Sequence, residues 1–392
     1  MNANTVLDVP KAAWRDDEEI IMFDDLVKKF FQKECEPYVD EWSKDGIVPK
    51  DIWLKAGELG ILGTCVPEEY GGIGGDFRHD AILTERVTWH KLDGWGLGLH
   101  NAITIPYILE YGTEEQKKRL LPKCISGEYV TAIAMTEPGT GSDLQSIKTT
   151  AIKDGNEYVL NGSKTFISNG QSADLILVCA KTDPKLGGKG ISIMLVETPP
   201  VEGKGGFKRG RNLDKVGIHI ADTSELFFDN VRIPADSVLG GVEGQGFAQL
   251  MESLPQERHQ IGVTAVAAME LAIDLTIEYV KDRKAFGKSV LDFQNTQFKL
   301  AEAKTTATVG KVFAEHCTEL LIKGELDTVT ASMSKYWLTD MACKIIDDCV
   351  QLHGGYGFMN EYHIAKMYKD QRVARIYGGT NEIMKLVIAR SL

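Results

Sequence analysis

A nine-residue segment, Met135-Thr136-Glu137-Pro138-Gly139-Thr140-Gly141-Ser142-Asp143, lies close to where the apolar pattern of the chain changes from helical to β. Its proline, its two glycines and its small hydroxyl residues predict a loop whose backbone can approach a ligand closely. The same composition also fits an ordinary turn. The segment is therefore a candidate ligand-binding loop beside a domain junction, with hydroxyl groups at Thr136 and Ser142.

Before this loop, apolar residues recur at steps of three and four, which is the spacing of one face of a helix. We expect helices at residues 17–44, 51–59, 76–92, 97–111 and 114–124. Gly-rich breaks such as residues 71–75 separate them. Residues 1–129 are thus predicted to form an N-terminal α-helical domain.

After about residue 130, short β-rich runs appear at residues 157–160, 175–179, 191–196 and 224–228. Turn sequences such as Asp154-Gly155-Asn156 punctuate them, so residues 130–241 are predicted to form a small antiparallel β-barrel or sandwich. Helical patterns return at residues 246–281, 294–323, 327–352 and 360–374, with a last helix from 381. They predict a C-terminal four-helix bundle over residues 242–392, and an α+β fold class for the chain.

The composition excludes several classes of protein. A net charge of −12 over 392 residues argues against a general nucleic-acid binder, although local cationic and backbone N–H groups can still hold a small polyanion. Seven cysteines without metal-ligand spacing predict reduced thiols in a reducing compartment, and isolated histidines predict no metal site. No apolar leader and no apolar run near about 20 residues is present, so we expect an intracellular protein without a membrane span.

Two further segments stand out, Leu254-Pro255-Gln256-Glu257-Arg258 and Arg375-Ile376-Tyr377-Gly378-Gly379-Thr380-Asn381-Glu382. Pro255 cannot donate a backbone hydrogen bond, so we expect it to kink or restart a helix just before Glu257. An apolar stretch that must pack inward follows. Among 56 acidic residues, however, any single glutamate is by default a surface residue.

Together the three segments make nearly the whole chain resemble the flavin-dependent acyl-CoA dehydrogenases. Most members carry their catalytic glutamate where this chain has Gly378, whereas the long-chain and isovaleryl types carry it where Glu257 stands. The resemblance implies that Glu257 removes the α-proton of an acyl-CoA thioester while the β-hydrogen passes to flavin N5, giving a trans-2-enoyl-CoA in fatty acid β-oxidation. It also implies that the backbone N–H of Gly378 and the FAD ribityl 2′-hydroxyl bind the thioester oxygen.

The resemblance assigns the remaining contacts residue by residue. FAD would be held by Met135, Thr136, Ser142, Phe166, Ser168, Arg283, Phe286, Gln294, Gln351, Gly354, Gly355, Thr380 and Glu382. The acyl-CoA substrate would meet Ser142, Arg258, Gly378 and Gly379. Phe166 and Ser168 replace the Trp and Thr of many members. Because Arg283 and the 351–355 turn would reach a neighbouring subunit's FAD, the resemblance implies a homotetramer built as a dimer of dimers.

Several alternatives stay open. Electrons would pass to an electron-transferring flavoprotein in a dehydrogenase, but to O₂ in an acyl-CoA oxidase, and a flavin-free scaffold of the same fold would not react at all. Nitroalkane-oxidase chemistry is disfavoured because that family uses an Asp base. Trp95 either lines the acyl pocket or belongs to the core. The substrate is expected to be long or branched, including terpenoid-like chains, and the location bacterial cytoplasm or mitochondrial matrix.

Overall fold

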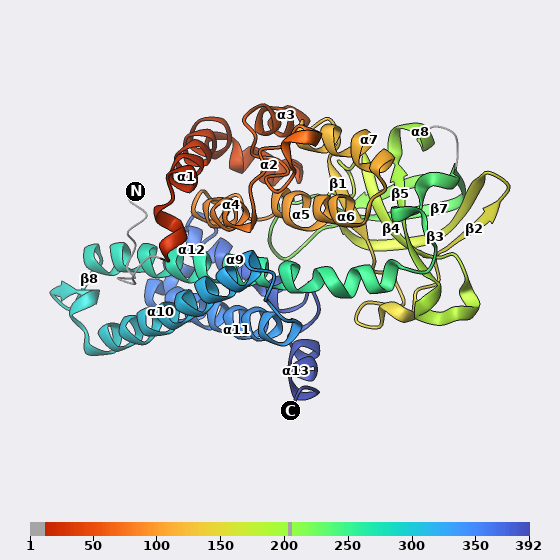
Figure 1. Cartoon of the computed structure of the whole chain (residues 1–392). Helices are drawn as coiled ribbons and strands as arrows, with labels where there is room; N and C mark the ends of the chain where they lie inside the picture. The colour runs from red at the N-terminus through yellow and green to blue at the C-terminus, as the bar shows by residue number, and fades with distance from the viewer. Residues whose placement is uncertain (1–11, 203–205) are drawn as a thin grey trace.

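The computed structural model describes residues 12–202 and 206–392 and divides the chain into three packed parts. Figure 1 shows the N-terminal helices lying over a C-terminal helical bundle, with the β-sheet at one end of the molecule. The long helix α9 (Gly246–Asp282) runs from the β-sheet along the bundle. It packs against α4 and α6 of the N-terminal part, β5 of the sheet, and α10 and α11 of the bundle.

The N-terminal part follows the predicted helices, with two interruptions. Its helices are α1 (Glu18–Phe30), α2 (Val39–Asp45), α3 (Lys50–Glu58), α4 (Phe77–Trp89), α5 (Leu97–Leu99), α6 (Ile105–Tyr111) and α7 (Glu114–Ile125). The helix predicted at 17–44 is divided by a π-helix and a 3-10 turn over residues 31–38, where Pro37 cannot donate a backbone hydrogen bond. The helix predicted at 97–111 is divided by a π-helix, His100–Thr104.

The middle part is a seven-stranded sheet with the order β1-β4-β2-β3-β7-β6 and with β5 paired to β4. The strands are β1 (Thr131–Ala134), β2 (Thr150–Asp154), β3 (Glu157–Ser168), β4 (Leu175–Lys181), β5 (Ile191–Glu197), β6 (Phe207–Asn212) and β7 (Thr223–Pro234), and a short helix, α8 (Thr198–Val201), follows β5. The prediction of an antiparallel sheet needs correction, because β4 runs parallel to both β1 and β2. The long connection from β1 through the β2–β3 hairpin allows this parallel pairing.

Strand β4 is buried on both faces, which joins the sheet to the N-terminal helices. Ile176, Val178 and Ala180 pack into the core of the β part. Leu177 and Cys179, on the other face, share a second core with α6 and α7. The two parts are therefore held together by one continuous apolar contact rather than by a linker.

The C-terminal part consists of α9, α10 (Gln294–Ile322), α11 (Thr328–His353), α12 (His363–Asp370) and α13 (Asn381–Ala389), with a small hairpin of β8 (Lys284–Ala285) and β9 (Lys288–Ser289) between α9 and α10. The fourth bundle helix, predicted at 360–374, is shorter because its last turn is a 3-10 helix, Gln371–Arg375. Helix α9 continues through Pro255, so the predicted restart does not occur. Proline removes one hydrogen bond, and the packing of α9 on its neighbours maintains the helix on both sides.

Two observations bear on the expected class of protein. All seven cysteines are free thiols. Among the described residues, one helix, α9, is long enough and apolar enough to cross a membrane. However, 72% of its most apolar stretch is buried inside the protein. The apolar character of α9 is accounted for by its place in the core.

Candidate active site

Glu257 is a buried carboxylate in the middle of α9. Its side chain is 5% exposed, and its Oε1 accepts a hydrogen bond of 2.8 Å from the phenol of Tyr107 on α6. Burial raises the pKa of the Glu257 carboxyl to about 7, against the opposing effects of this hydrogen bond and of the Arg258 charge. A carboxyl group with such a pKa can exchange protons near neutral pH, which suits a general base.

The Gly378-Gly379 pair approaches the same helix. Gly378 has φ +63° and Gly379 has φ +87°, in the left-handed region that favours glycine. A Cβ atom on Gly378 would collide with Cδ1 of Ile261, which lies one helical turn after Glu257. The backbone of Gly378 therefore lies beside the face of α9 that carries the buried carboxylate.

A buried lysine fixes this glycine loop. Nζ of Lys335 on α11 donates to the Gly379 carbonyl at 2.7 Å and to Oδ1 of Asn381 at 2.9 Å. Lys335 is fully buried, and burial together with the nearby Arg258 charge lowers its pKa to about 8. Thr380 then caps α13, because its hydroxyl accepts from the Ile383 N–H at 3.3 Å. The loop is held at two points.

Arg258, which was expected near the substrate, turns toward α11. Its Nη1 donates to the Ser332 hydroxyl at 3.2 Å, and its buried Nε has no partner. Arg258 makes no hydrogen bond to Glu257 among the described residues and acts on it through its charge. The structure thus places Arg258 beside Lys335, behind the glycine loop.

The 135–143 loop is anchored at its base and open at its tip. Glu137 is buried and accepts from Nζ of Lys164 at 2.9 Å and from the backbone N–H groups of Lys148 at 2.7 Å and Thr149 at 2.9 Å. Lys164 also donates to the Met135 carbonyl at 2.9 Å. Gly139 and Gly141 have no other atoms within 4 Å of an added Cβ, so this part of the loop is accessible to a ligand.

Phe166 lies next to this loop and is not a core residue. It is 68% exposed, has φ +60°, and sits in a β-bulge between Lys164 and Ile167. The bulge re-aims its side chain, as bulges beside active sites commonly do. The adjacent Thr165 N–H donates to the Thr136 carbonyl at 3.0 Å, so the exposed ring and the loop form one unit. Ser168 is partly buried further along the strand.

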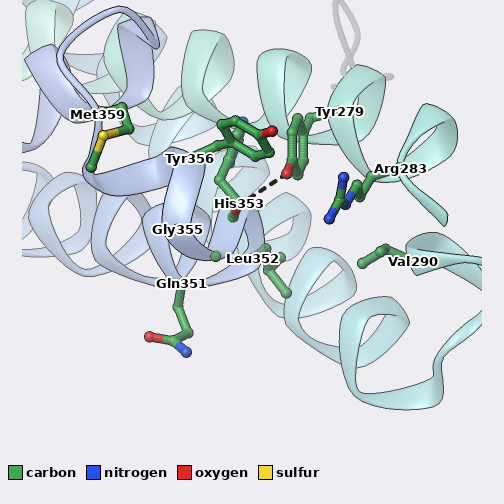
Figure 2. Close-up of a pocket in the computed structure, with 10 residues that line it drawn as sticks. Tyr279, Arg283, Val290, Gln351, Leu352, His353, Gly355, Tyr356 and Met359 are labelled. Atoms are coloured by element: carbon green, nitrogen blue, oxygen red, sulfur yellow. Dashed lines mark hydrogen bonds between the residues drawn. The ribbon is translucent and has the colours of Figure 1, made fainter. Parts of the chain in front are cut away.

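A pocket of about 460 Å³ is lined by four of the residues assigned to FAD, namely Arg283, Gln351, Gly354 and Gly355. Figure 2 shows Tyr279 and Tyr356 beside Arg283 at this pocket. The Arg283 guanidinium lies 5.7 Å from the centre of the Tyr356 ring, and the Tyr279 hydroxyl donates to the His353 carbonyl at 3.1 Å. A cationic fork between aromatic rings and a glycine turn can hold an anionic group.

Other predicted residues lie outside this pocket. Phe286, at the turn of the β8–β9 hairpin, is 96% exposed, and Gln294 is exposed at the first turn of α10. Glu382 is exposed at the start of α13. In Figure 1 this hairpin lies at the end of the bundle remote from the β-sheet.

Trp95 belongs to the core rather than to a ligand pocket. It is 4% exposed and packs against Trp53 with 5.5 Å between ring centroids and against Phe31 with 5.9 Å. The buried Asn169 connects this region to the β-sheet, since its Nδ2 donates to the Gly96 carbonyl at 3.2 Å. Of the two interpretations of Trp95, the structure supports the core.

Three residues that position the site were not predicted from the sequence: Tyr107, Lys164 and Lys335. Lys335 had a detectable signal, because it shares a helical stripe with the buried Ala331, Leu338 and Ala342. Tyr107 had none, since it lies 150 residues before Glu257. Within residues 12–202 and 206–392, no group of three or more His, Cys, Asp or Glu side chains could hold a metal ion.

Comparisons with known proteins give the same family for all three parts of the chain. Family models for the N-terminal, middle and C-terminal domains of acyl-CoA dehydrogenase match residues 17–128, 132–231 and 244–392. The long-chain specific acyl-CoA dehydrogenase, mitochondrial, of Sus scrofa is 48% identical over 373 residues, covering 95% of this chain and 86% of the relative.

Solved structures show the same similarity. The crystal structure of acyl-CoA dehydrogenase from Geobacillus kaustophilus has a TM-score of 0.92 and 49% identity, covering 95% of this chain and 98% of the other. A glutaryl-CoA dehydrogenase from Mycobacterium smegmatis in complex with FADH2 has a TM-score of 0.87 and 28% identity, covering 96% and 94%. The predicted three-part fold is confirmed by these matches.

Proposed function

The chain belongs to the acyl-CoA dehydrogenase family of FAD-dependent oxidoreductases, and we propose that Glu257 is its catalytic base and a long-chain acyl-CoA its substrate. The observation that carries the assignment of the base is the buried Glu257 carboxyl, which lies one helical turn from the residue that contacts the Gly378 loop and whose pKa is raised to about 7 by burial. The 48% identity to a long-chain specific acyl-CoA dehydrogenase supports the substrate class. The domain division proposed is 1–129, 130–241 and 242–392, which the ranges of the three family models support.

The proposed reaction begins with removal of the α-proton of the thioester by a Glu257 oxygen. Negative charge then develops on the thioester oxygen, and an N–H donor there lowers the barrier. The anchored loop supports the assignment of that donor to the backbone of Gly378, with Gly379 and Ser142 beside the ligand. Bound FAD supplies the acceptor for the β-hydride.

The residues present fit FAD. An exposed aromatic ring at Phe166 and the open loop suit a flat, polar ring system, so we assign Met135, Thr136, Ser142, Phe166 and Ser168 to the flavin end. We assign Arg283, Phe286, Gln294, Gln351, Gly354 and Gly355 to the diphosphate and adenosine end, and Thr380 and Glu382 to the same cofactor at the start of α13. The separation of these groups within one chain supports a shared site in a homotetramer, a dimer of dimers.

The proposed electron acceptor is an electron-transferring flavoprotein, and the long-chain specific relative supports a role in fatty acid β-oxidation. An acyl-CoA oxidase of the same fold would instead pass electrons to O₂. Anaerobic reduction by acyl-CoA followed by admission of air separates the two, because slow reoxidation supports the flavoprotein and reoxidation as fast as turnover supports the oxidase. A panel of straight and branched acyl-CoAs tests the chain, and we expect long straight chains to reduce the flavin fastest.

Replacing Glu257 by Gln tests the base. We expect Glu257→Gln to lower the rate of anaerobic flavin reduction by about 10²–10⁴-fold, because an amide cannot accept the α-proton and general acid–base catalysis contributes about that factor. The flavin absorption spectrum should be unchanged, since no FAD residue is altered. Stopped-flow absorbance at the flavin band measures the rate.

The control is Glu252→Gln, which changes an exposed carboxylate on the same helix. It should reduce the rate by less than about twofold, as surface substitutions commonly do. Near-normal turnover of Glu257→Gln with bound FAD would show that Glu257 is not the catalytic base.

A further inference from the structure

The contact between Tyr107 and Glu257 joins two domains at the proposed base. The Tyr107 hydroxyl donates to Oε1 of Glu257 at 2.8 Å across 150 residues of sequence. The tyrosine is fully buried and the glutamate is 5% exposed, so water does not compete freely for this hydrogen bond. Hydrogen bonds to an ionised acceptor in such a setting are the strong ones.

Tyr107 is held rigidly. Its ring belongs to the apolar cluster shared by α6, α7 and strand β4. The π-helix His100–Thr104 precedes it, and the Ala102 carbonyl of that π-helix accepts a hydrogen bond of 2.8 Å from Nε2 of Gln256 on α9. The π-helix and α6 are therefore bonded to consecutive residues of α9, Gln256 and Glu257, which holds the phenol beside the carboxylate.

The two carboxylate oxygens have different surroundings. Oε1 accepts the hydrogen bond from Tyr107. Oε2 makes no hydrogen bond among the described residues, and it is not fully enclosed by protein atoms. Rotation of the carboxylate about its Cγ–Cδ bond would break the contact at Oε1, so this contact also fixes the direction of Oε2. The second oxygen is thus the one available for a proton.

We infer that Tyr107 is a positioning residue for the base: its hydroxyl holds Oε1 of Glu257, presents Oε2 to the substrate α-carbon and favours the charged carboxylate. The inference rests on the proposed function of Glu257. It extends that function by giving the base a fixed partner from another domain, which no motif in the sequence contains.

The electrostatic surroundings indicate the direction of the effect. The titratable and charged groups that face Glu257 are Tyr107 from α6, Cys179 from β4 and Arg258 from α9 itself. Burial raises the pKa of Tyr107 well above its ordinary value and that of Cys179 to about 11, so both are neutral at pH 7. Loss of the Tyr107 hydroxyl removes a donor to the charged form, which raises the pKa of Glu257.

The test uses the FAD-loaded enzyme and two matched variants, Tyr107→Phe and Tyr111→Phe. Tyr111 lies one turn further along α6, and its hydroxyl contacts Glu252 and Ser253 instead of the base. We expect the acidic limb of kcat/KM in Tyr107→Phe to move up by about one pH unit, which is about tenfold slower turnover at pH 6. Tyr111→Phe should retain the wild-type profile.

A second measurement does not depend on turnover. The infrared band of the protonated Glu257 carboxyl, assigned by its absence in Glu257→Gln, should titrate at higher pH in Tyr107→Phe than in the wild type. The inference would be overturned if the Glu257 carboxyl titrated at the same pH in Tyr107→Phe and in the wild type, or if both phenylalanine variants had the same pH profile of kcat/KM. A wild-type enzyme that no acyl-CoA reduces would instead overturn the proposed function, and the infrared titration would still decide the role of Tyr107.

Discussion

Beside the proposed base, Ile261 occupies the space that a side chain at position 378 would need. Gly378 has φ +63°, and the space where its side chain would begin is filled by Cδ1 of Ile261. Ile261 lies on α9 one turn after Glu257, so the helix that carries the carboxylate also blocks the alternative position for it. At the residue scale, the glycine is required both by its backbone conformation and by its neighbour.

This steric block predicts what is needed to transfer the base from position 257 to position 378. Glu257→Gln with Gly378→Glu should remain nearly inactive, because the new side chain meets Ile261 and the left-handed backbone disfavours it. Adding Ile261→Ala should raise the rate of anaerobic flavin reduction by about tenfold, since relief of overpacking of about 1–3 kcal/mol corresponds to that factor or more.

The comparison of double and triple variants contains its own control. Both should retain the flavin absorption spectrum. Equal rates in the two variants, with FAD bound, would show that Ile261 does not block the position.

At the scale of elements, a buried ion pair joins strand β3 to the 135–143 loop. Lys164 is fully buried and bonds both Glu137 and the Met135 carbonyl, so it fixes the loop relative to the bulge that exposes Phe166. Burial lowers the pKa of Lys164, and the partners of Glu137 overcome the effect of burial to lower its pKa. The Glu137 charge is thus stabilised by hydrogen bonds from Thr149 and Lys148 and by the Lys164 charge, whereas for Lys164 burial outweighs the stabilising charge of Glu137.

Lys164→Met should destabilise the protein by about 3–5 kcal/mol, because it leaves Glu137 buried without its counter-charge. FAD should also bind more weakly, since the loop loses its anchor. Urea denaturation and titration of flavin fluorescence measure the two effects. The exposed Lys153 on β2 gives the control, and Lys153→Met should change stability by less than about 0.5 kcal/mol. Equal losses in both variants would show that the buried pair is dispensable.

The elements also show what the sequence can and cannot predict. Helices such as α9 and α11 follow from apolar spacing, which is a local property. The parallel pairing of β4 with β1 and β2 depends on strands that are distant in sequence, and no local pattern specifies it. Likewise Glu257 was predicted from its own segment, whereas its partner Tyr107 arises only from the packing of α6 on α9.

At the scale of the whole molecule, a cluster of charges joins the N-terminal part to the bundle. Glu85 on α4 lies 2.6 Å from both Arg15 and Lys311, and Glu315 lies 2.6 Å from Arg15. These side chains are 12–16% exposed. Burial alone would raise the pKa of Glu85, but the charges of Arg15 and Lys311 outweigh it and hold that pKa well below its ordinary value.

The sign of these pKa changes defines a pH window for stability. Glu85 has a lowered pKa, so its contribution is complete above its ordinary value of 4.5 and is lost as the pH falls toward its folded value. Lys311 has a pKa raised by Glu85 and Glu270 despite burial, so its contribution is complete below 10.5 and is lost as the pH rises through its folded value. The contact between the domains should be strongest between these limits.

Glu85→Gln should therefore destabilise the protein by about 3–5 kcal/mol at pH 7, because Arg15 and Lys311 lose their shared counter-charge. The difference from wild type should shrink steadily below pH 4.5, where the wild type loses the same interaction. Denaturant midpoints at pH 7 and pH 3.5, at one protein concentration, measure both effects. Glu157→Gln, which removes an exposed ion pair with Arg232, should change the midpoint little at either pH. A loss in Glu85→Gln that is the same at both pH values would show that the cluster contributes through packing rather than through charge.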